Sequence, residues 1–214
     1  MLYNKSFQVN PLGENCYVVS DDTGEAVIID CGCFTKNEWN NIKAYIDTNN
    51  LKPVHLLDTH LHFDHCLGNH FVKDDYGLYP EANDKDLFLY NNMENQLYNF
   101  FMECNIDFTM PPLAKAFSDN DTITFGNHKL KVMTTPGHSP GSVVFYCEEE
   151  DILWSGDTVF MGSVGRCDLE GGNYKDMLLS ISNKIKTLPP STVVFPGHGP
   201  STTIADEMDY NPYF

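Results

Sequence analysis

The segment Thr59–His65 places three histidines and an aspartate within six residues, namely His60, His62, Asp64 and His65. Neutral imidazoles and ionised carboxylates are the nitrogen and oxygen ligands that suit Zn²⁺, and they also suit Fe and Mn. Side chains of this kind, crowded into so short a segment, have few purely structural uses. The segment therefore predicts a metal-binding loop, in which an extended stretch followed by a turn can serve two adjacent metals.

Two later histidines stand in matching turns: His138 follows Pro-Gly, and His198 lies in a Pro-Gly-His-Gly sequence. A histidine-rich surface loop would account for Thr59–His65 alone. It would not account for two more histidines held on tight glycine turns after predicted strands. We therefore expect His138 and His198 to join the same site.

Acidic residues recur where predicted strands end, at Asp30, Asp58 and Asp157. Such an aspartate either forms a simple turn or orients a neighbouring loop. Arg166, the only arginine in the chain, lies nine residues beyond Asp157. A permanently charged guanidinium near acids orients them or anchors a loop, although a surface role is the alternative.

The elements that would position these residues follow from apolar periodicity and turn residues. Strands are predicted at 7–9, 16–20, 26–30 and 53–58, then at 122–125, 129–134, 142–147, 152–155 and 192–195. Helical spacing is found at 35–49, 81–102 and 174–185. The aromatic-rich region 81–102 either lines a pocket or, as we favour, packs against the body. Two strand-rich halves, each with helices, predict an α/β αββα sandwich of two mixed sheets flanked by helices, folded as one domain over 1–214.

Composition narrows the classes of function. The chain of 214 residues has a formal net charge of −17, which disfavours nucleic acid and anionic membrane surfaces as partners. There is no signal-like N-terminus and no long apolar run, so a cytoplasmic location is expected. The seven cysteines form an odd set without the context of a disulfide scaffold, which predicts reduced thiols.

The ordered set His60-x-His62-x-Asp64-His65, His138, Asp157 and His198 resembles the complete ligand set of the metallo-β-lactamase superfamily. Asp30 matches the strand-end aspartate of that superfamily. The segments around His138, Asp157, Arg166 and His198, and the Asn-Pro-aromatic ending, are similar to the glyoxalase II-like (hydroxyacylglutathione hydrolase-like) branch. The chain stops where full-length glyoxalase II continues into a helical glutathione-binding domain, so it resembles the short form, and the thiol carrier stays undecided.

The resemblance implies two metals, most simply Zn²⁺, with Fe or Mn as alternatives. It implies His60, His62 and His138 on one metal, Asp64, His65 and His198 on the other, and Asp157 between them. A hydroxide bridging the metals would attack the carbonyl of an acyl-thioester such as S-lactoylglutathione or a related thiol ester, with Asp64 as ligand or proton acceptor. Asp30, Asp58 and Arg166 would hold the ligands in orientation.

Three alternatives stay open. Relatives with the same pattern include mononuclear iron persulfide (sulfur) dioxygenases, and other hydrolases share the fold. The aspartate at position 157 argues against zinc β-lactamases that use a thiolate there. A binding module on the same scaffold would normally have lost ligands, and this sequence keeps them all.

Overall fold

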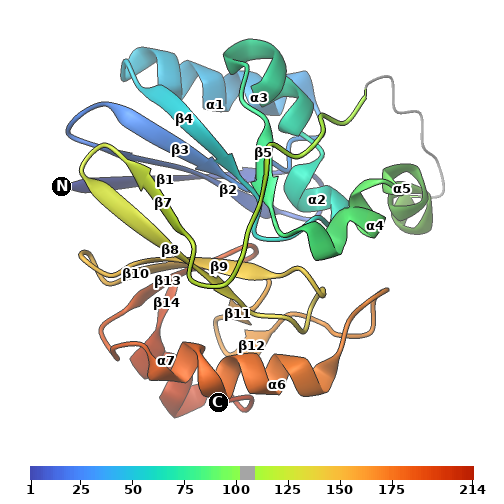
Figure 1. Cartoon of the computed structure of the whole chain (residues 1–214), viewed down its shortest axis with the longest axis vertical. Coiled ribbons are helices and arrows are strands. Elements are labelled where there is room, and N and C mark those ends of the chain that lie inside the picture. The colour runs from blue at the N-terminus through green and yellow to red at the C-terminus, as the bar shows by residue number, and fades with distance from the viewer. Residues whose placement is uncertain (102–108) are drawn as a thin grey trace.

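A computed structural model describes residues 1–101 and 109–214. Its centre is a pair of six-stranded mixed sheets, packed face to face and covered on their outer sides by helices (Figure 1). The predicted αββα sandwich is therefore confirmed. Within the described part of the chain, no helix has the length and apolar character needed to cross a membrane.

The first sheet has the order β1-β2-β3-β4-β5-β6. Its strands are β1 (Leu2–Val9), β2 (Glu14–Asp21), β3 (Glu25–Ile29), β4 (Lys52–Leu57), β5 (Pro80–Ala82) and β6 (Lys115–Ala116). The first three form an antiparallel meander, and β4 runs parallel to β3 after the crossover helix α1 (Lys36–Thr48). Thr35 caps α1 in a capping box with Glu38.

The second sheet has the order β14-β13-β10-β9-β8-β7. Its strands are β7 (Thr122–Phe125), β8 (His128–Thr134), β9 (Val143–Cys147), β10 (Ile152–Gly156), β13 (Val193–Pro196) and β14 (Thr202–Thr203). β10 and β13 run parallel across α6 (Tyr174–Asn183), so both end at the same edge of the sheet. A short hairpin of β11 (Val159–Phe160) and β12 (Ser163–Val164) follows β10.

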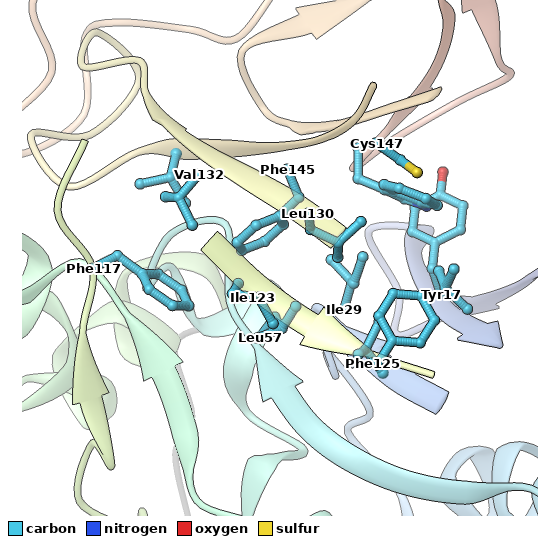
Figure 2. Close-up of a cluster of buried hydrophobic side chains, with 14 residues drawn as sticks. Tyr17, Ile29, Leu57, Phe117, Ile123, Phe125, Leu130, Val132, Phe145 and Cys147 are labelled. Atoms are coloured by element: carbon cyan, nitrogen blue, oxygen red, sulfur yellow. The ribbon is translucent and has the colours of Figure 1, made fainter. Parts of the chain in front are cut away.

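The main core fills the space between the sheets. Tyr17, Ile29 and Leu57 of the first sheet meet Phe125 and Phe145 of the second (Figure 2). The outer faces are also buried: α1 and α3 (Asn69–Tyr76) cover the first sheet, and α6 and α7 (Ile204–Tyr210) cover the second. With both sheets covered on both faces, their edges are where polar loops are free to gather.

The region 81–102 differs from the single helical stretch that was predicted. It begins inside strand β5, continues through a 3₁₀ turn (Asp84–Asp86), and then forms α4 (Leu87–Tyr90) and α5 (Met93–Phe101). Tyr90, Met93 and Leu97 pack against α2 (Phe63–Cys66), as favoured from the sequence. Met102 lies outside the described residues, as does Cys104; the six described cysteines are free thiols.

Candidate metal centre

The loop Thr59–His65 begins two residues after the end of β4 and is fixed to both sheets. The Thr59 backbone N–H and hydroxyl donate to the two oxygens of Asp30, each at 2.7 Å. The Thr59 carbonyl accepts from the N–H of Val143, the first residue of β9 in the second sheet. The start of the loop therefore has little freedom, and His60 and His62 are buried beside the junction of the two sheets.

Three histidines from two distant segments form the first group. One nitrogen each from His60, His62 and His138 lies within 4.8 Å of the others, and His62 Nδ1 is 2.8 Å from His138 Nε2. His138 comes from the turn between β8 and β9, where Gly137 adopts φ +155° and passes close to Met177 of α6. The predicted association of the loop with His138 is present in the structure.

Asp64, His65 and His198 form a second group with the same spacing limit. The carboxylate of Asp157, just beyond β10, lies between the two groups: its oxygens are 3.3 Å from His65 Nε2, 3.5 Å from His138 Nε2 and 3.8 Å from His198 Nε2. One carboxylate thus faces imidazoles of both groups.

Three of the atoms that would bind metals have no hydrogen-bond partner in the part of the chain that the structure describes. His60 Nε2, His65 Nε2 and Asp157 Oδ1 are buried and have no hydrogen-bond partner within the described residues. Buried polar atoms are rarely left unpaired, because the loss of hydration is costly. The donor set, histidine nitrogens and carboxylate oxygens, therefore fits a pair of divalent transition-metal ions.

The opposite ring nitrogens are held by the protein. His138 Nδ1 donates to the Arg166 carbonyl at 2.7 Å, His65 Nδ1 lies 3.1 Å from Asp30 Oδ2, and His198 Nδ1 lies 3.2 Å from the Leu12 carbonyl. Such contacts select the tautomer that leaves Nε2 free for a metal.

The two groups differ in charge. Burial, with His138 nearby, lowers the pKa of His62 to about 3, and burial with the surrounding histidines lowers that of His60 well below its usual value. Both imidazoles are neutral at pH 7, as metal ligation requires. Burial opposes a charged His65 as well, but Asp157 and Asp64 outweigh it and raise the pKa of His65. Metal binding at His65 would therefore release a proton.

The side chains of Asp58 and Arg166, which were expected to orient the metal ligands, form hydrogen bonds with other residues instead. The Asp58 carboxylate is buried and accepts from the Asn69 side chain at 2.7 Å, rather than from a ligand histidine. The Arg166 guanidinium points to Asp168, to which it donates at 2.7 and 2.8 Å, and only its backbone carbonyl supports His138. The expectation that the arginine side chain orients the acids is wrong. Asp30, in contrast, contacts both Thr59 and His65 as expected.

Asp86, which follows β5, was missed from the sequence. Its buried carboxylate accepts from the Ser139 hydroxyl and the Gly141 N–H at 2.6 Å, and from the Leu61 N–H at 3.3 Å. It thereby ties the Thr59–His65 loop to the turn that carries His138. The only hint in the sequence was an Asp-Lys-Asp cluster at the start of a helical region.

Glu14 was missed as well. It is fully buried, both of its carboxyl oxygens lack hydrogen-bond partners among the described residues, and one of them lies within 4.8 Å of ligand atoms on Asp30 and His65. Burial raises the pKa of Glu14 well above its usual value, which favours the neutral acid.

A cavity of about 370 Å³ opens over the two groups. Its floor includes His62, Asp64, His138, Asp157 and His198. Its remaining walls are Leu12, Phe63, Phe100, Phe160, Ser163, Val164, Arg166 and Leu169. A substrate in this cavity would contact the ligand cluster directly, so the cavity is the candidate active site.

Two covered sheets, with a paired histidine and aspartate cluster at their common edge, define a class of metal-dependent hydrolases. Residues 9–198 match the family model described as the metallo-beta-lactamase superfamily, and the chain belongs to this superfamily. It is accordingly a metal-dependent hydrolase of that superfamily, as the sequence resemblance indicated.

Individual relatives cover nearly the whole chain. The probable metallo-hydrolase YqgX of Bacillus subtilis is 36% identical over 96% of this chain and 94% of its own length. The hydroxyacylglutathione hydrolase GloC of Haemophilus influenzae is 31% identical, with the same coverage. Among solved structures, BLEG-1 B3 metallo-beta-lactamase has a TM-score of 0.85 at 34% identity, covering 100% of this chain and 99% of that one. TTHA1623 in a di-iron-bound form has a TM-score of 0.85 at 34% identity, covering 98% and 100%.

Proposed function

We propose that this chain hydrolyses acyl-thioesters with a pair of divalent metals, most simply Zn²⁺. The observation that carries the proposal is the position of Asp157, whose carboxylate faces both the His60/His62/His138 group and the Asp64/His65/His198 group. A carboxylate so placed suits two adjacent metals better than one. The similarity to GloC supports a thioester such as S-lactoylglutathione or a related thiol ester as substrate.

The residues have separable roles in this proposal. His60, His62 and His138 would hold one metal, Asp64, His65 and His198 the other, and Asp157 would contact both. When bound, such metals lower the pKa of a water ligand from about 15.7 to about 7 and stabilise negative charge that develops on a carbonyl oxygen. The neighbouring His65 keeps the pKa of Asp64 below its usual value despite burial, so Asp64 is available as an anionic ligand or proton acceptor.

The reaction adds water across the acyl C–S bond and releases a carboxylic acid and a thiol. A thiol has a pKa of about 8.5, so the thiolate leaves without a strong general acid. The described cavity accordingly needs to position the carbonyl over Asp157 rather than protonate the leaving group. The acidic net charge supports a small-molecule substrate over nucleic acid or a membrane surface, and the free thiols support a cytoplasmic location.

A second candidate is hydrolysis of a β-lactam amide, which the likeness to BLEG-1 supports. The nitrogen leaving group of an amide needs a proton donor more than a thiolate does.

The likeness to the di-iron form of TTHA1623 supports iron as the alternative metal.

The test is metal content as purified, followed by turnover of acyl-thioesters, a β-lactam and a persulfide. We expect about two metals per chain and thioester hydrolysis. β-Lactam hydrolysis without thioester hydrolysis would favour the second candidate. One iron per chain with oxygen uptake on a persulfide would instead identify a dioxygenase and overturn the proposal.

A further inference from the structure

Above its floor of metal-ligand candidates, the active-site cavity has mostly apolar walls, with Ser163 and Arg166 as the polar residues among the lining that the structure describes. Leu12 comes from the β1–β2 turn, Phe63 from α2, Phe100 from α5, Phe160 from β11, Val164 from β12 and Leu169 from the loop before α6. Segments from both halves of the chain thus contribute aliphatic or aromatic surface. A substrate that reaches the metal ligands must place its acyl group and its thiol carrier against these walls or through the mouth between them.

The cavity offers almost no positive charge outside its floor. Arg166 is the only lysine or arginine among its lining residues, and both oxygens of Asp168 accept from its guanidinium. The whole chain has a formal net charge of −17, and two divalent cations would offset only four of these charges.

We infer, building on the proposed thioester hydrolysis, that the preferred substrates carry an uncharged thiol carrier and that carboxylates or phosphates on the carrier weaken binding. Recognition of a carrier carboxylate or phosphate normally uses arginine or lysine in a free fork or point contact. Here the single candidate, Arg166, already donates to both oxygens of Asp168. Apolar walls, by contrast, stabilise an uncharged carrier through burial of its hydrocarbon surface.

Binding of a matched pair of thioethers tests the inference independently of turnover. S-hexylglutathione and its dimethyl ester share one skeleton, but the ester lacks both carboxylates. With the zinc-loaded protein, calorimetry at low salt should give the ester an affinity about tenfold higher, a difference of about 1.4 kcal/mol. The difference should shrink in about 1 M salt, where the Debye length is about 3 Å. Equal affinities, or tighter binding of the free acid, would overturn the inference.

Turnover on the corresponding pair of lactoyl thioesters is the separate readout for the proposed function. If neither thioester is hydrolysed, the proposed function fails, while the binding preference between the two thioethers still decides the charge selectivity of the cavity.

The pair formed by Arg166 and Asp168 gives a second test. Asp168→Asn would free the guanidinium, so affinity for the free acid should rise about threefold while affinity for the ester stays constant. Asp22→Asn makes the same change in net charge just beyond the far end of β2, about 25 Å along the strand direction from Glu14. An unchanged affinity for the free acid in Asp168→Asn, or an equal gain in Asp22→Asn, would contradict the role given to this pair.

Discussion

Asp157 is the residue whose loss should have the largest effect. Its two oxygens face imidazoles supplied by the loop after β4, by the β8–β9 turn and by the segment after β13. Asp157→Ala should remove metal and activity together. Its losses of metal affinity and of turnover should each exceed the roughly 10 to 100-fold loss typical of residues that contact only the ligands. Elemental analysis and turnover of the same preparation measure both. A variant that kept two metals and full turnover would show that Asp157 is not a shared ligand.

Asp30 should affect metal affinity through its contact with His65, and not by binding a metal itself. It accepts from Thr59 and lies 3.1 Å from His65 Nδ1. Asp30→Asn keeps the size of the side chain and tolerates the left-handed φ of +53°. We expect a 10 to 100-fold loss of metal affinity, measured by competition with a chelator.

Asp58→Asn is the matched control for Asp30→Asn. Asp58 is equally buried but hydrogen-bonds to Asn69, and burial raises its pKa so that the neutral acid is favoured. We expect nearly wild-type metal affinity. Equal losses in the two variants would mean that Asp30 acts through general stability and not through His65.

At the residue scale, local spacing was enough to select side chains that the structure brings together. His60, His62, Asp64 and His65 are recognisable because their types and spacing suffice. Asp86 was not recognisable, since its partners Ser139 and Gly141 are more than 50 residues away in the chain. The direction of the Arg166 side chain likewise depended on how one loop folds beside Asp168.

The loop after β13 has almost no room beside the cluster. A Cβ atom on Gly197 would meet the side chains of Asp157 and His65, although the backbone there does not require glycine. Gly197→Ala should therefore displace these ligands and cost about 1–3 kcal/mol through overpacking, with at least a tenfold loss of metal affinity.

Gly199→Ala is the control in the same loop. Its added methyl meets nothing within 4 Å, although φ is +78°. It should lose about 1–2 kcal/mol of stability from backbone strain while binding metal normally. Denaturant unfolding and metal titration separate the two effects, and normal metal binding by Gly197→Ala would rule out the steric explanation.

Strand β2 ends in Asp21, which joins the first sheet to the β7–β8 turn of the second. It accepts from the Asn127 and Thr23 N–H groups at 2.6 and 2.9 Å, and from His128. Burial opposes its ionisation, but these hydrogen bonds outweigh that effect and lower the pKa of Asp21 from 3.8 to about 2. The ionised form therefore stabilises the fold.

Because the folded pKa of Asp21 is depressed, this stabilisation is complete above about pH 4 and is lost as the pH falls toward 2. Asp21→Asn should lower the free energy of unfolding by about 1.5–3 kcal/mol at pH 7, and the deficit should narrow below pH 4. Urea unfolding from pH 7 to 3 measures it, with Asp209→Asn, at an exposed position of α7, as control. A deficit independent of pH would mean that the carboxylate charge is not responsible.

Long periodic elements were predictable, and short paired ones were not. Helix α1 was predictable because its apolar spacing and its capping residue, Thr35, are both local signals in the sequence. Strands β5 and β6 are three and two residues long; β5 forms by pairing with the parallel edge of β4, and β6 by pairing with β5. No periodicity can be read from so few residues, so the region after Tyr79 was predicted as one helical segment.

For the whole molecule, the metal centre is a connection between the two sheets. The first sheet delivers His60, His62, Asp64 and His65 after β4, whereas strands of the second deliver His138, Asp157 and His198. Without metals the two sets meet largely through unpaired nitrogens and a few carboxylate contacts. Metal binding should therefore stabilise the packing of one sheet against the other.

Removing the metals should lower global stability. A ligand that binds only the folded state stabilises it by about 4 kcal/mol when its free concentration is 1,000 times the Kd. We expect the chelated protein to unfold at a lower urea concentration, with recovery when zinc is restored. Asp157→Ala should unfold near the midpoint of the chelated wild type and respond little to either treatment. Identical midpoints for the metal-loaded and chelated wild type would show that the core between Tyr17, Phe125 and Phe145 holds the sheets together without the metals.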